Sequence, residues 1–129
     1  MVEEKRISER VIECAQNVSR ELGAGFLETV YENALALELD SYRINYRRQK
    51  DFDVCYRNTV VGQYRADYVV ENKLIIELKA LSILHGQHEA QVMNYLRASG
   101  LKVGLLLNFG TTRLGIRRVV WDYDDNENI

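Results

Sequence analysis

The chain has 129 residues, of which 47% are hydrophobic and 28% are charged. These are the values of an ordinary globular domain, and they exclude an intrinsically disordered chain and an integral membrane protein. The formal net charge of -2 gives no overall attraction for nucleic acid, so a polyanionic partner would require a local basic patch or bridging cations.

The length predicts one domain, with a core large enough to need no disulfide or metal support. We expect this domain to span residues 1–121 and a short acidic tail to follow at 122–129. No apolar run reaches the length of a membrane span, and the charged residues 2–6 do not resemble a signal peptide. The sequence therefore predicts a cytoplasmic protein without a membrane partner. Cys14 and Cys55 lack the spacing of a zinc site and are expected to be buried free thiols.

Two helices are expected at the start of the chain. Between residues 7 and 22 apolar side chains recur at steps of three and four, which indicates one buried helical face. Gly23 and Gly25 end this helix, and a second helix is expected from about 26 to 40. On that second helix Glu28 lies on a face that is otherwise small or apolar. It is either a functional acid or a first-turn glutamate favoured by the helix dipole.

A basic stretch without acids follows at residues 43–50. It is either a local patch for a polyanion or the solvated face of an edge strand, and the two interpretations are equally supported. The chain continues as a strand or hairpin to residue 57, with a turn at Asn58 before a strand from 60 to 70. The basic residues of this stretch are Arg43, Arg47, Arg48 and Lys50.

The central feature is the stretch 67–79, two runs of β-type residues joined at 71–73. Alternation of side chains along a strand places Glu77 and Lys79 on the same face. If the turn has three residues, Asp67 falls directly opposite Glu77, with Cβ atoms about 4.5 to 5.5 Å apart. Carboxylates that close repel unless one is protonated or a cation lies between them, so this register predicts a site. A turn of even length would send Asp67 to the other face of the sheet and remove the site. A glutamate and a lysine two residues apart are also common on the solvated side of a half-buried strand, where they have no further role.

A third helix is expected at residues 81–99, where Gln91 and Tyr95 lie one turn apart and point together. A surface glutamine beside a tyrosine at the edge of the core is the alternative. The apolar run from 102 to 109 predicts a strand buried on both faces and parallel to its neighbour, and a last strand is expected at 114–121. Three arginines add a second basic cluster near this last strand: Arg113, Arg117 and Arg118.

Segments of this chain resemble one family. Residues 25–31, GFLETVY, match the pattern that names the GxxExxY family, which is placed in the PD-(D/E)xK nuclease superfamily. The resemblance covers about residues 5–120 and implies an α/β (α+β) fold, with a restriction-endonuclease-like core and a mixed central sheet flanked by helices. The further matching segments are Arg65-Ala66-Asp67, Ile76-Glu77-Leu78-Lys79-Ala80, Gln91-Val92-Met93-Asn94-Tyr95-Leu96 and Leu107-Asn108-Phe109-Gly110.

The resemblance also implies roles for the catalytic residues. Asp67 and Glu77 would hold Mg²⁺ or Mn²⁺, and Lys79 would orient or deprotonate the attacking water. Glu28 would be a third metal ligand or a nearby base. Ala66 departs from the family pattern because it stands where proline often precedes the aspartate, but it removes no ligand.

By the same resemblance, Gln91 and Tyr95 match the Q-x-x-x-Y of recombination-type exonucleases and would position the substrate. The expected function is divalent-metal-dependent hydrolysis of phosphodiester bonds in nucleic acid, with DNA preferred over RNA as the partner. The alternative is a non-catalytic module that keeps the nuclease fold to bind nucleic acid or a protein. A nuclease this small could enclose its substrate as a homodimer, although no residue indicates one.

Overall fold

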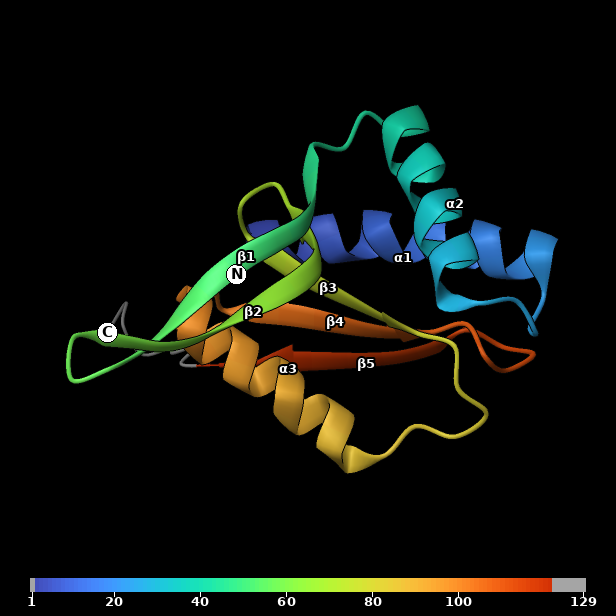
Figure 1. Ribbon diagram of the computed structural model, residues 1–129. Helices are drawn as coiled ribbons and strands as arrows, with labels where there is room; N and C mark the ends of the chain where they lie inside the picture. The colour runs from blue at the N-terminus through green and yellow to red at the C-terminus, as the bar shows by residue number, and fades with distance from the viewer. Residues whose placement is uncertain (1, 122–129) are drawn as a thin grey trace.

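A computed structural model describes residues 2–121, in which helices cover both faces of a five-stranded sheet (Figure 1). The predicted acidic tail at 122–129 lies outside the described residues. The elements, in order, are α1 Val2–Leu22, α2 Glu28–Ser41, β1 Tyr46–Tyr56, β2 Thr59–Val70, β3 Leu74–Lys79, α3 Gly86–Ser99, β4 Val103–Asn108 and β5 Gly115–Val120. The predicted α/β class with a mixed central sheet is confirmed.

The strands lie in the order β1-β2-β3-β4-β5, so that neighbours in the sequence are also neighbours in the sheet. β3 and β4 are parallel, as predicted, and the other neighbouring strands pair antiparallel. Every residue of β4 is buried, which agrees with its continuous apolar run. A parallel pair needs a crossover, and α3 supplies it between β3 and β4.

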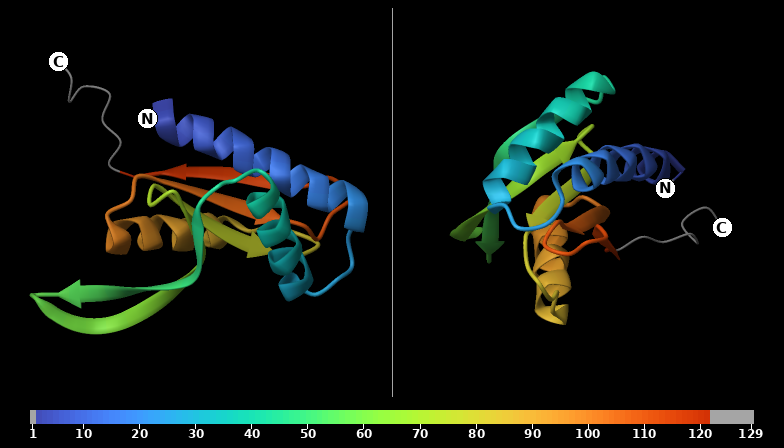
Figure 2. Two further views of the ribbon diagram at one scale, coloured as in Figure 1. Left: turned by 90° about the horizontal axis from the view of Figure 1, so that it is seen from above. Right: turned by 90° about the vertical axis from the view of Figure 1, so that its right-hand side faces the viewer.

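The two faces of the sheet carry separate cores. On one face α1 and α2 pack against alternate residues of β3, among them Leu74, Ile76 and Leu78. On the other face α3 packs against Ile75 (Figure 2). Because side chains alternate along a strand, Glu77 belongs to the face of Ile75, against which α3 packs.

The β1–β2 hairpin extends well beyond the rest of the sheet (Figure 2). β2 pairs with β3 over three residues only, from Tyr68 to Val70, so the outer part of the hairpin pairs with itself alone. We call this outer part, residues 51–65, the hairpin arm. Its turn has Arg57 and Asn58 at φ 50° and 62°, the conformation that a tight two-residue hairpin turn requires. The turn predicted at Asn58 is therefore confirmed.

The third helix begins later than predicted, at Gly86 and not at 81. Leu81 cannot enter a helix because its backbone is held from outside. Its N–H donates to Oδ1 of Asn108 at 2.9 Å, and its carbonyl accepts from Nδ2 of the same side chain at 2.9 Å. A contact between residues so far apart in the sequence leaves no trace in local periodicity.

The first helix begins at Val2, which is earlier than the start predicted at residue 7. Its first turn contains Glu3 and Glu4, whose negative charges interact favourably with the helix dipole. This interaction extends the helix beyond its buried face. Within residues 2–121, no helix combines the length and the apolar content that crossing a bilayer requires.

Candidate functional site

The turn between β2 and β3 has the predicted three residues, 71–73. Val70 pairs with Leu74, and the ladder continues until Tyr68 pairs with Ile76. Backbone pairing then stops, one residue pair before the two carboxylates that the register brings together. The two strands separate at the point where the predicted site lies.

At this point side chains replace the backbone bonds of the ladder. The N–H of Asp67 donates to Oε1 of Glu77 at 3.2 Å, and the N–H of Leu78 donates to Oδ2 of Asp67 at 2.8 Å. Each carboxylate thus binds an amide of the opposite strand. We call Asp67 and Glu77, at the separation of β2 and β3, the carboxylate fork.

The carboxylate fork holds two acids where their charges are poorly compensated. Burial raises the pKa of Glu77 to about 8, and the charge of Asp67 adds to the rise. Burial also raises the pKa of Asp67, while the N–H of Leu78 opposes that rise. Glu77 is only 8% exposed, so water does little to screen the repulsion. A cation at the fork would relieve it.

Glu28 and Lys79 act on the same fork. Glu28 is the first residue of α2. Burial and then the charge of Asp67 raise its pKa, and the ammonium of Lys79 opposes the rise. Lys79, the last residue of β3, likewise offsets the charges of Asp67 and Glu77. Asp67 therefore lies within electrostatic reach of the three other residues predicted to be catalytic.

The loop before Glu28 is fixed by the tyrosine of the GxxExxY pattern. The hydroxyl of Tyr31 donates to the carbonyl of Gly23 at 2.6 Å and accepts from the N–H of Phe26 at 3.1 Å. Its ring stacks on Phe109, with centroids 4.8 Å apart. Gly25 has a φ of 115°, which favours glycine. Glycine and tyrosine thus shape the segment that presents the glutamate.

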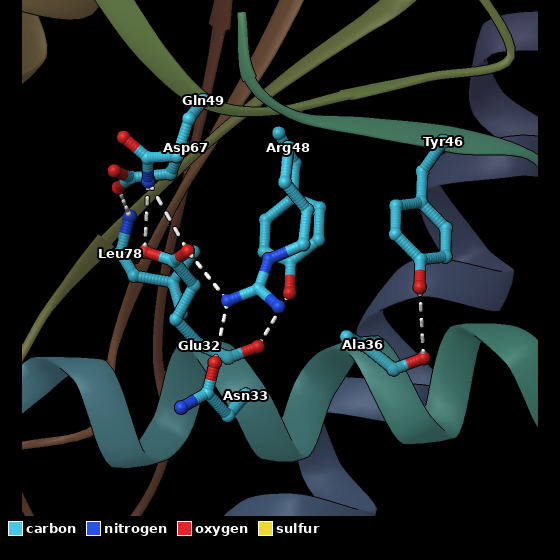
Figure 3. Close-up of polar contacts among 9 residues, drawn as sticks. Glu32, Asn33, Ala36, Tyr46, Arg48, Gln49, Asp67 and Leu78 are labelled. Atoms are coloured by element: carbon cyan, nitrogen blue, oxygen red, sulfur yellow. Dashed lines mark hydrogen bonds and ion pairs between the residues drawn. The ribbon is translucent and has the colours of Figure 1, made fainter.

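Glu32, one turn after Glu28, is a fifth charged residue that sequence reasoning missed. It is buried, and its carboxylate accepts from Nη2 of Arg48 at 2.8 Å and from Nε2 of Gln49 at 3.0 and 3.1 Å (Figure 3). Its charge adds to the rise that burial causes in the pKa of Asp67. The spacing of four from Glu28, which places both on one helix face, was the available signal.

Gln49 adopts a backbone conformation that is rare for a residue other than glycine. Neighbouring residues of a strand normally point to opposite faces, yet Arg48 and Gln49 both reach Glu32. The φ of Gln49 is 52°, and the pairs Arg48 with Tyr68 and Lys50 with Ala66 continue on either side of it. Strained residues of this kind are common at functional sites.

The predicted basic patch does not present four equivalent cations. Arg48 is bound to Glu32 and also donates to Oδ1 of Asn33 at 2.6 Å. The ammonium of Lys50 lies 5.6 Å from the centroid of the Phe52 ring. Two residues of the patch remain as exposed charges beside the start of β1: Arg43 and Arg47.

Gln91 and Tyr95 lie on α3, next to the carboxylate fork. Burial raises the pKa of Tyr95, the charges of Glu77 and Asp67 add to the rise, and a hydrogen bond with Gln91 opposes it. The Tyr95 ring stacks on Tyr64, with centroids 3.8 Å apart. Gln91 and Lys79 line one shallow hollow, together with Gln87, His88, Ala90 and Asn94.

Across residues 2–121, no group of three or more His, Cys, Asp or Glu side chains is arranged to hold a metal ion by itself. The two hydrogen-bonded carboxylates of the fork are nevertheless a suitable set for Mg²⁺. That ion is usually bound in proteins by one or two carboxylates and takes its remaining ligands from water and substrate phosphates.

Comparison with known proteins agrees with this fold. The crystal structure of the protein SSO0001 superposes with a TM-score of 0.60 at 19% sequence identity, over 75% of this chain and 52% of that chain. This likeness concerns the fold, and the chain spans about half the length of that protein. Among curated proteins none matches significantly. The profile of the PD-(D/E)XK nuclease superfamily matches residues 5–119. The chain therefore belongs to the PD-(D/E)XK nuclease superfamily.

Proposed function

We propose that the protein is a divalent-metal-dependent nuclease that hydrolyses phosphodiester bonds. The carboxylate fork is the observation that carries this proposal. It places the half-buried Asp67 and the buried Glu77 beside each other on diverging strands, with Lys79 two residues beyond Glu77. Within the superfamily, the pattern at residues 25–31 supports the finer assignment to the GxxExxY family.

Mg²⁺ or Mn²⁺ is the metal that suits these donors. Carboxylate oxygens are the ligands that such hard cations prefer, and proteins of this superfamily commonly use divalent metals. The raised pKa values of Asp67 and Glu77 express a repulsion that a divalent charge would offset. We assign Asp67 and Glu77 as the principal ligands, with Glu28 as a further ligand directly or through water.

The remaining residues have distinct tasks. A bound cation lowers the pKa of water and neutralises charge on the phosphate that is cleaved. Lys79 orients the attacking water and attracts the phosphate. Gln91 and Tyr95 position the nucleic-acid strand beside the carboxylate fork, because the side chain of Gln91 lines the same hollow as Lys79. Stacking on Tyr64 holds the Tyr95 ring in place.

Nucleic acid is the partner that this chemistry requires, and we propose DNA as the substrate to test first. The alternative is a binding module that keeps the fold without catalysis. Calorimetry with Mn²⁺ separates the two proposals. A folded protein that binds no Mn²⁺ at millimolar concentration is a module, whereas an enzyme binds it and loses affinity in the Asp67→Asn variant.

Cleavage of single- and double-stranded DNA and RNA with Mg²⁺ or Mn²⁺ tests the nuclease directly. Asp67→Asn should reduce the rate by at least about 100-fold, since loss of even an outer partner of a metal ligand costs 10- to 100-fold. The matched control is Asp53→Asn, an exposed acid of the hairpin arm that accepts from Gln63 at 2.7 Å. Cleavage that survives Asp67→Asn in a folded protein refutes the assignment.

A further inference from the structure

A hollow of about 440 Å³ lies between the end of α1 and the loop that joins β4 to β5. None of the proposed catalytic residues lines it. Two of its lining residues are arginines, one from each segment, and two carry hydroxyl groups. The lining residues are Gln16, Ser19, Arg20, Thr112, Arg113 and Leu114.

The arginines of this hollow have no acidic partner in the part of the chain that the structure describes. No acidic residue among residues 2–121 lines it. Nη2 of Arg20 donates to Oδ1 of Asn17 at 2.6 Å, which is a neutral amide. The guanidinium of Arg113 has no hydrogen bond or ion pair to any part of the chain between residues 2 and 121. Within residues 2–121, nothing therefore neutralises either charge.

A second hollow on α1 shows the contrast. It lies at the opposite end of the helix and is also lined by two arginines, Arg6 and Arg10. There, however, Glu3 and Glu71 belong to the same lining. Arg10 also donates to a backbone carbonyl at 2.6 Å. Of these two hollows on α1, the one at Arg20 thus combines paired arginines with a lining free of acids.

The end of α1 and the loop between β4 and β5 lie at the same end of the sheet as the end of β3, the strand that carries Glu77 and Lys79 (Figure 1). The loop that carries Arg113 leaves β4 directly after Asn108, whose side chain holds Leu81, two residues beyond Lys79. On the other side, α1 leads from Arg20 through a short loop to Glu28. Arg20 is therefore close in the chain to Glu28, and the loop of Arg113 begins after Asn108, the residue that pairs with Lys79.

We propose that Arg20 and Arg113 bind phosphate groups of the nucleic-acid backbone next to the bond that is cleaved. This inference rests on the proposed nuclease function and names where that substrate is held. Guanidinium groups match phosphate oxygens with two parallel hydrogen bonds, and hydroxyls such as that of Thr112 are common further donors. A local positive site is needed because the net charge of -2 and the acids of the fork repel a polyanion.

Binding without cleavage tests this proposal independently of catalysis. The probe is a fluorescently labelled DNA duplex of about 20 base pairs, titrated with protein in EDTA over a range of salt concentrations. Arg113→Glu and Arg20→Glu should each weaken binding by about 10-fold or more. Each should also make the plot of log K against the logarithm of the salt concentration shallower, by about 0.9 for every phosphate that is no longer neutralised. The neutral variant Arg113→Gln should lie between wild type and Arg113→Glu.

Arg6→Glu is the matched control, since it reverses an exposed charge of the same helix far from the hollow. It should leave the affinity close to that of wild type. Equal losses in Arg6→Glu and Arg113→Glu, or an unchanged affinity in Arg113→Glu, overturn the proposal. If the wild type cleaves DNA but Arg113→Glu binds DNA with unchanged affinity, the proposed phosphate site is wrong and the proposed nuclease function is retained. If binding depends on Arg113 but no cleavage occurs, the phosphate site stands and the nuclease is wrong.

Discussion

Ionisation of Glu77 should destabilise the protein when no metal is present. Its pKa rises from 4.5 to about 8 on folding, first because of burial and then because of the charge of Asp67. Each tenfold change in proton affinity corresponds to 1.36 kcal/mol, so the full change is worth at most about 5 kcal/mol. Below about pH 4.5, Glu77 is protonated in both the folded and the unfolded protein, so its burial costs no stability. Stability should therefore fall as the pH rises from about 4.5 through about 8.

Urea denaturation in EDTA at pH 5 and pH 9 measures this effect. Glu77→Gln keeps an oxygen that can accept from the N–H of Asp67 but cannot ionise. At pH 5 the variant and the wild type should have similar free energies of unfolding. At pH 9 the variant should be the more stable by about 2 to 5 kcal/mol, the lower bound allowing for relaxation of the charged site.

Two controls make this test decisive. Glu13→Gln, which changes an exposed glutamate of α1, should follow the wild-type pH profile. Addition of Mn²⁺ at pH 9 should stabilise the wild type, because a ligand that binds only the folded state raises its stability, and should stabilise Glu77→Gln less. Parallel pH profiles for Glu77→Gln and wild type would refute the argument from burial and repulsion.

Three further substitutions test other contacts. Tyr31→Phe removes the hydroxyl that makes two hydrogen bonds to the loop before α2, and should lower the free energy of unfolding by about 1 to 3 kcal/mol in urea. Glu32→Gln removes the charge from the hydrogen bonds between α2 and β1; we expect a loss of about 1 to 3 kcal/mol, and an unchanged urea midpoint would contradict it. Gly110→Ala would drive a Cβ into the backbone of Leu81, so thermal denaturation should show a loss of more than about 3 kcal/mol, whereas Gly62→Ala, with open space around it, should show little change.

Local patterns predicted the elements and the register because both depend on residues close in sequence. The alternation in β3 and the short turn at 71–73 were enough to bring Asp67 opposite Glu77. The start of α3 was mispredicted because its position depends on the distant side chain of Asn108. Long-range hydrogen bonds of this kind do not alter hydrophobic periodicity.

The basic patch shows a second limit of sequence reasoning. Arg48 reads as an exposed cation of an edge strand, but it binds the buried Glu32. Gln49 also binds Glu32, and it has a left-handed conformation that nothing in its neighbours signals. Glu32 itself was missed because a glutamate on an amphipathic helix is usually solvated. The pairing of Arg48 with Glu32 depends on how α2 packs near β1, and this packing is a property of the complete fold.

The hairpin arm makes this protein convenient for spectroscopy. Its strand β1 carries Cys55, for which the prediction of a buried thiol was wrong because the arm leaves it exposed. Cys14 is buried in α1, as predicted, and burial raises the pKa of its thiol to about 12. Since the thiolate is the form that reacts, a maleimide dye should modify Cys55 and spare Cys14. A reporter attached there lies close to the turn of the arm, several residues along the ladder from the carboxylate fork. Energy transfer between that dye and a labelled oligonucleotide would then reveal the direction in which a bound strand runs.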